Sequence, residues 1–143
     1  MANANAYKIR TGPFAGRYGV DVDSNKTLGI ADSGLVQNVI ADGVVVTLPA
    51  TATQGIWPVV LGGVRQTSGP VGAITGNAKQ LVQISPNASD KIQGGPDGTA
   101  TDDKDMILTK ANSKVGDFMV IHNTGETNGP LVAAYKGAWG REA

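Results

Sequence analysis

The stretch "GDFMVIHNTGETNGPLVAAYKGAWGREA" (residues 116–143) contains the strongest fold signal in the chain. Two apolar runs, 117–123 and 131–139, flank a polar turn that holds two glycines and an asparagine. Such residues tolerate the positive φ angles of tight turns, so the stretch predicts an antiparallel hairpin. Alternation along the second run places Tyr135 and Trp139 on one face, where we expect them to close a β core.

A second hairpin is predicted from the runs "LVQNVI" (35–40) and "VVVTLP" (44–49), which are separated by Ala41, Asp42 and Gly43. An Asp-Gly pair between β-branched runs is typical of a hairpin turn.

Four further segments have strand character. Pro58 in "GIWPVVLGG" (55–63) cannot donate to a strand ladder, so we expect this strand at an edge or a bulge. Residues 71–76 and 81–85 are further strand candidates, and 106–110 fits either a strand or a short helical turn. Strands at this spacing predict an all-β fold, a small antiparallel β-sandwich, jelly roll or β-barrel.

The composition agrees with strands joined by turns. The 143 residues include 20 glycines and 7 prolines, only 17% are charged, and cysteine is absent. This length predicts one β domain, residues 20–143, preceded by an extended N-terminal arm, residues 1–19. Twelve basic residues balance 12 acidic ones. We therefore expect no nucleic-acid partner, and a charge near zero favours self-association.

Neither a signal peptide nor a membrane span is expected. The N-terminus lacks a basic segment followed by an apolar one, and the apolar runs are shorter than the roughly 18 residues of a membrane helix. We expect synthesis in a cytoplasm and no membrane partner.

The N-terminal arm carries more apolar residues than a solvated tail usually does. It is either a loose terminus or an arm that becomes ordered against a partner. On the second interpretation, the predicted interface residues are Tyr7, Ile9, Arg10, Phe14, Arg17 and Tyr18.

Candidate catalytic residues are few. His122 is the sole histidine, and it lies in an apolar strand with no nucleophile motif in the sequence. We expect it to be structural or at the surface, and we expect no enzyme activity and no cofactor.

Two acidic segments could bind calcium through oxygen ligands. The first contains Asp97, Asp102, Asp103 and Asp105, which we interpret as a solvated loop. The second, "DVDSNKTLGIAD" (21–32), places Asp21, Asp23, Asn25 and Asp32 at EF-hand-like positions, but Lys26 stands where the sharp turn needs glycine. We therefore expect no metal at either segment.

Three stretches resemble small virion proteins of tailed bacteriophages, most closely the head decoration (cement) class. They are "VVVTLPATA" (44–52), "LVQISPNASDKIQG" (81–94) and "TDDKDMILTKANSKVGDFMVIHNTGETNGPLVAAYKGAWGREA" (101–143). The first 43 residues lie outside the resemblance. Pro130 departs from it, because an aromatic residue is expected after the "GETNG" turn.

The resemblance implies a structural protein on the outer surface of an expanded icosahedral capsid. It would form a homotrimer that bridges copies of the major capsid protein. The alternative is a tail, baseplate or head-fibre module that binds a host glycan, with Trp57 or Trp139 exposed in a groove.

Overall fold

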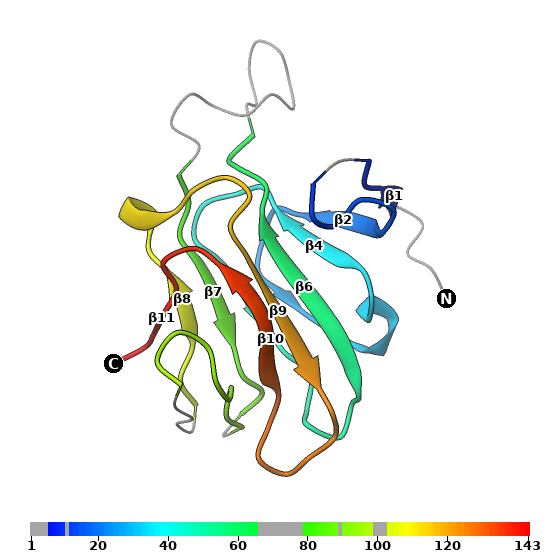
Figure 1. Cartoon of the computed structure of the whole chain (residues 1–143), viewed down its shortest axis with the longest axis vertical. Coiled ribbons are helices and arrows are strands. Elements are labelled where there is room, and N and C mark those ends of the chain that lie inside the picture. The colour runs from blue at the N-terminus through cyan, green and yellow to red at the C-terminus, as the bar shows by residue number, and fades with distance from the viewer. Residues whose placement is uncertain (1–5, 11, 66–78, 89, 99–102) are drawn as a thin grey trace.

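Strands dominate the computed structural model, which describes residues 6–10, 12–65, 79–88, 90–98 and 103–143 (Figure 1). The strands are β1 (Tyr7–Lys8), β2 (Tyr18–Val22), β3 (Lys26–Thr27), β4 (Val36–Val39), β5 (Val44–Thr47), β6 (Gly55–Leu61), β7 (Val82–Ser85), β8 (Met106–Leu108), β9 (Phe118–Asn123), β10 (Leu131–Lys136) and β11 (Gly140–Arg141). Two short 3-10 helices, η1 (Ile30–Asp32) and η2 (Lys110–Asn112), complete the described elements. Segment 106–110 thus contains a strand and the start of a helical turn, 81–85 is a strand as predicted, and 71–76 lies outside the described residues.

The strands form two packed sheets, which confirms the β-sandwich. The first sheet has the order β1-β2-β4-β6-β9-β10, the second has the order β11-β8-β7-β5-β3, and they do not close into a barrel. Both sheets are mixed, whereas the sequence predicted antiparallel pairing throughout. The strand pairs β2/β4, β4/β6, β3/β5 and β5/β7 are parallel, and the remaining named pairs are antiparallel.

The parallel pairs arise from three successive arches, in which the chain leaves the first sheet and continues in the second. The arches are β2–β3, β4–β5 and β6–β7, and they stack so that equivalent residues align. In the first sheet Val22 pairs with Val39, and Val39 pairs with Leu61. These three side chains are at most 3% exposed, so the alignment forms one column of the core.

The hairpin predicted for residues 35–49 is therefore wrong. β4 and β5 belong to different sheets, and the bend at residues 41–43 connects the two layers. Gly43 has a φ of 77°, as a tight turn requires, but its N–H donates to the carbonyl of Leu81 on the neighbouring arch. The Asp-Gly pair forms a tight bend, as predicted. The bend hydrogen-bonds to the neighbouring arch, however, and does not connect two paired strands.

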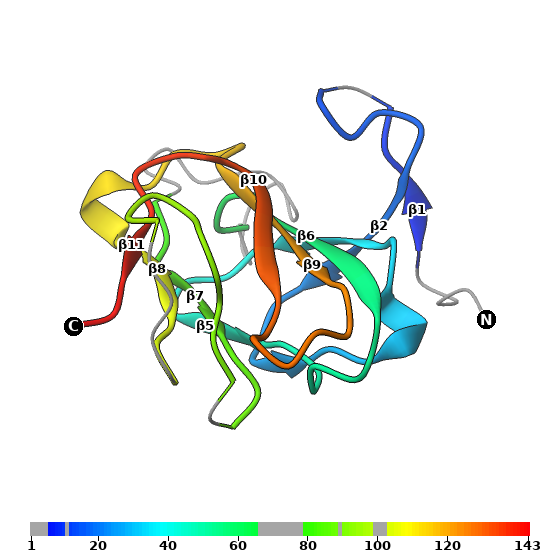
Figure 2. The same ribbon diagram turned by 60° about the horizontal axis from the view of Figure 1, so that its bottom comes forward.

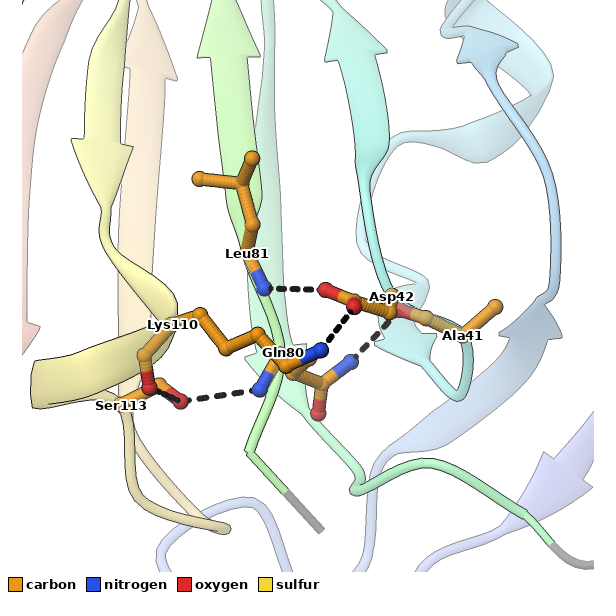
Figure 3. Close-up of polar contacts among 6 residues, drawn as sticks. All are labelled: Ala41, Asp42, Gln80, Leu81, Lys110 and Ser113. Atoms are coloured by element: carbon orange, nitrogen blue, oxygen red, sulfur yellow. Dashed lines mark hydrogen bonds and ion pairs between the residues drawn. The ribbon is translucent and has the colours of Figure 1, made fainter.

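Side chains near this bend join three separate segments (Figure 3). Asp42 accepts hydrogen bonds from the Leu81 N–H at 2.8 Å and from the Lys110 Nζ at 2.6 Å. These two donors, the Leu81 N–H first, lower the pKa of Asp42. Beside them the buried Gln80 donates to the Ala41 carbonyl, and its own backbone N–H donates to Ser113 Oγ. The ends of β4, β7 and η2 are fixed to one another in this way.

Pro58 lies inside the first sheet and not at an edge, because β6 pairs with β4 on one side and β9 on the other. The Gly62 N–H donates to the Val39 carbonyl. The register of β6 with β4 runs from Gln37 and Val59 onward, and proline at position 58 has no N–H to give. The fully buried Gln37 donates its Nε2 to the Leu35 oxygen at 3.2 Å. The pairing of β6 with β4 thus begins at Val59, one residue after the proline.

The C-terminal hairpin is confirmed, since β9 and β10 pair antiparallel with a bulge between Val132 and Ala134. Trp139 is buried as predicted, at 4% exposure, and its Nε1 donates to the carbonyls of Phe118 and Lys136. The prediction for Tyr135 is wrong, because it is 45% exposed. Among the described strands β10 is at the edge of the first sheet, and its outer side is bridged by Gln93 at Leu131.

Candidate functional site: the cleft beneath the N-terminal hairpin

Residues 6–10 and 12–19, the described part of the predicted arm (1–19), fold back as an N-terminal hairpin on the edge of the first sheet. Tyr7 pairs with Gly19 and Lys8 pairs with Tyr18. Ile9 and Arg17 close the loop with a 2.8 Å backbone hydrogen bond. Figure 2 shows the hairpin standing out from the sandwich, on the side opposite β11.

Three contacts hold the hairpin against the body. The ring of Phe14 meets the ring of Phe118 edge-on, with centroids 5.1 Å apart. The Tyr7 hydroxyl donates to Asp21 Oδ1 at 2.9 Å. At Gly19 a Cβ would lie 3.1 Å from the Val36 carbonyl oxygen, so glycine permits the close approach of β2 and β4. Burial, followed by the hydrogen bond to Asp21, raises the pKa of Tyr7 to about 12.

The hairpin and the outer face of the first sheet enclose a cleft of about 910 Å³. This volume lies within the range of ligand-binding pockets, roughly 300–1,000 Å³. The described residues that line it are Tyr7, Lys8, Ile9, Arg10, Gly12, Pro13, Phe14, Asp21, Val36, Asn38, Ile40, Val60, Arg65 and Gly116. Most of these are apolar, and three are cationic.

The charges in the cleft are unbalanced. Lys8, Arg10 and Arg65 face a single carboxylate, that of Asp21. Asp21 Oδ1 already accepts hydrogen bonds from the Tyr7 hydroxyl and from Asn38 Nδ2. Within the part of the chain that the structure describes, none of the three cations forms an ion pair. The cleft therefore carries an excess of positive charge in a protein whose net charge is zero.

A smaller hollow of about 470 Å³ lies on the other side of the hairpin base. Arg17, Tyr18, Ile30 and Leu35 are among its lining residues. Tyr18 is 53% exposed and Ile30 is 67% exposed, so two large side chains meet solvent here.

The six residues predicted as an interface thus divide between two neighbouring surfaces. Tyr7, Ile9, Arg10 and Phe14 line the cleft, and Arg17 and Tyr18 line the smaller hollow. Sequence reasoning missed Ile30, Asn38, Ile40, Val60 and Arg65, which come from η1, β4, β6 and the segments that follow these two strands. No local pattern marks them, since only the parallel stacking of arches brings them beside the hairpin.

A third hollow, of about 620 Å³, is formed by η2, the segment after it and the end of β10. Lys79, Lys114 and Lys136 line it together with Asp117. Lys79 Nζ donates to the Ala111 carbonyl, and Asp117 Oδ2 accepts from the Lys114 N–H. This lysine-rich hollow lacks the aromatic residues of the cleft.

The candidate calcium ligands of the EF-hand-like segment (21–32) contact different parts of the protein. Asn25 accepts from the Val45 N–H, and Asp32 pairs with Lys26 at 3.1 Å. Asp21 belongs to the cleft, and Asp23 lies in the connection between β2 and β3.

The acidic residues of the second segment also have different surroundings. Asp97 pairs with Arg141 at 2.9 Å, Asp103 has a positive φ of 53°, and Asp102 lies outside the described residues. Burial raises the pKa of Asp105, which accepts from Gln83 Nε2 at 3.3 Å. Across the described residues, no group of three or more histidine, aspartate or glutamate side chains is arranged to hold a metal ion.

The aromatic residues suggested for glycan stacking lie in the core. Trp57 is 0% exposed and Trp139 is 4% exposed, so neither presents a ring face to a ligand. His122 is at the surface of β9, as one of the two sequence expectations had it. Among the described residues, no helix has the length and apolar character needed to cross a bilayer.

No family model, curated protein or solved structure matches this chain. Function is therefore inferred from the chain's own residues and from the geometry of the hairpin.

Proposed function

We propose that the chain is a structural virion protein that decorates and stabilises the outer surface of an expanded icosahedral phage capsid. It would act as a trimer that bridges neighbouring copies of the major capsid protein. It works by binding, without catalysing a reaction.

The observation that carries this proposal is the N-terminal hairpin, which stands out from the sandwich (Figure 2). Large side chains are exposed at its base. Tyr18 and Ile30 are more than half exposed, and the cleft lies on the other side of the hairpin. An apolar surface beside a cleft marks a docking region more often than an isolated exposed side chain does. A sandwich core supplies the stiffness that a bridge between capsid proteins requires.

Two general arguments support assembly in many copies. A protein with no net charge lacks the mutual repulsion that keeps copies apart. A trimer that engages three capsid proteins at once multiplies a modest contact through effective concentration.

The test adds purified protein to expanded capsids that lack it and counts the bound copies by mass spectrometry and electron microscopy. Tyr18→Ser should lower the occupancy, whereas Tyr135→Ser should leave it unchanged. The two tyrosines are a matched pair, 53% and 45% exposed, but only Tyr18 lies at the hairpin.

A variant lacking residues 1–16 removes most of the hairpin but keeps β2, and it should not bind. Hundreds of wild-type copies per particle would fit the proposal. A handful of copies would indicate a tail component, and no binding at all would refute the capsid role.

A further inference from the structure

The cleft beneath the hairpin combines an apolar lining with positive charge. We propose that it docks an extended acidic segment of the partner protein, in which carboxylates alternate with apolar side chains. This inference rests on the proposed function, because it specifies the chemistry of the capsid segment that the decoration protein would bind.

Charge complementarity is the first argument. Arg65 is only partly exposed, and it lies in the cleft without a described carboxylate partner. A guanidinium in such a place gains most from a carboxylate, because the two groups can form parallel charge-assisted hydrogen bonds. Asp21 does not fill this role, since none of the ion pairs among the described residues joins it to Arg65.

The apolar lining is the second argument. Ile9, Ile40 and Val60 are partly buried and line the cleft between the charged groups. A ligand with carboxylates alone would leave this surface in contact with water. An extended chain places alternate side chains on opposite sides, so one chain can offer carboxylates to the cations and apolar groups to the lining.

The aromatic side chains of the cleft argue against single-stranded nucleic acid as the ligand. Such a ligand usually needs aromatic rings that are free to stack on bases. The edge-on contact with Phe118 already engages the ring of Phe14, and Asp21 holds the Tyr7 hydroxyl.

The smaller hollow beside the hairpin indicates that the partner is a macromolecule. Arg17, Tyr18 and Ile30 continue the cationic and apolar character around the other side of the hairpin. A partner that contacts both surfaces must be larger than either hollow, as a protein segment attached to a folded body would be.

The experiment titrates the isotope-labelled full chain with a short capped peptide of alternating aspartate and leucine, and it follows backbone amide shifts. An asparagine–leucine peptide tests the charge, an aspartate–serine peptide tests the apolar groups, and oligothymidylate tests nucleic acid. We expect shifts at Ile9, Val60 and Arg65, and weaker binding as salt rises.

Arg65→Gln should weaken binding of the aspartate–leucine peptide about tenfold, the effect of losing one charge-assisted contact. Lys136→Gln is the matched control, because it removes one cation from the lysine-rich hollow. A dispersed amide spectrum for each variant verifies that it is folded.

Several results would overturn the inference. They are an absence of peptide binding, equal affinity for the asparagine–leucine or aspartate–serine peptide, tighter binding of oligothymidylate, and shifts centred on Lys79 and Lys114. Equal peptide affinity of Arg65→Gln and wild type would do the same.

Capsid occupancy separates this inference from the proposed function. If wild type and Arg65→Gln occupy capsids equally, the cleft is not the docking site, although the decoration role survives. If wild type fails to bind capsids, the decoration role is refuted, and the peptide titration still decides the chemistry of the cleft.

Discussion

Replacing Gln80 with leucine should destabilise the sandwich by about 2–4 kcal/mol. The side chain is 0% exposed and makes three hydrogen bonds to backbone groups. Its Nε2 donates to the carbonyls of Val39 and Ala41 at 3.1 and 2.9 Å, and its Oε1 accepts from the Gly63 N–H at 2.8 Å.

Leucine is similar in size, so it leaves little cavity and the loss is mainly polar. The Val39 carbonyl keeps its bond from the Gly62 N–H, so the Ala41 carbonyl and the Gly63 N–H are the two groups that lose a partner. Each buried backbone group without a partner costs about 1–3 kcal/mol. The bond to Ala41 is only partly buried and contributes at the low end of that range. The resulting sum is a large part of the roughly 5–15 kcal/mol that stabilises a typical domain.

Urea unfolding measured at equilibrium provides the assay, with Gln54→Leu as the control because Gln54 is exposed. The control should change the free energy of unfolding by less than about 0.5 kcal/mol. If Gln80→Leu lost under about 1 kcal/mol with an unchanged m-value, the three bonds would not hold the arches together and the argument would fail.

Three further outcomes are expected. Trp139→Ala should lower the free energy of unfolding by about 3–5 kcal/mol, as large core truncations do, and normal stability in calorimetry would contradict a core role. Spectrophotometric titration should show a tyrosine that ionises near pH 12 and disappears in Tyr7→Phe; because this pKa is raised from 10.0 on folding, its stabilisation is complete below pH 10 and is lost as pH rises through 12. The lowered pKa of Asp42 contributes stability above its usual value of 3.8 that is lost as pH falls through the lower folded value, so Asp42→Asn should reduce the acid dependence of unfolding; an unchanged pH profile would count against this.

The sequence predicted the all-β class and the last hairpin because both are encoded locally. Turn residues 124–129 and the alternation in β9 act over a few neighbouring positions. The tryptophan at 139 was assigned to the core on the same basis. The exposure of Tyr135 was not predicted, since it depends on β10 lying at the edge of its sheet.

Pairings between distant segments were missed. An Asp42-Gly43 bend suits either a hairpin or an arch, and what decides between them is the parallel alignment of β4 with β2 and β6. The place of Pro58 was missed for a related reason, because the strands on both sides of β6 come from distant parts of the chain. The hairpin residues were recognised by their composition, but Arg65 became part of the site only through the folding of β6 beside it.

The stacking of the arches provides a way for a protein of this kind to become longer by adding units. Each arch meets its neighbours through the same parallel alignment, as Val22, Val39 and Leu61 do. A duplicated strand–bend–strand unit could therefore join the stack without changing the pairing of the others, as in repeat proteins. Growth by whole units would move the hairpin away from the C-terminal strands in fixed steps, which would adapt the span of the molecule while leaving its two ends intact.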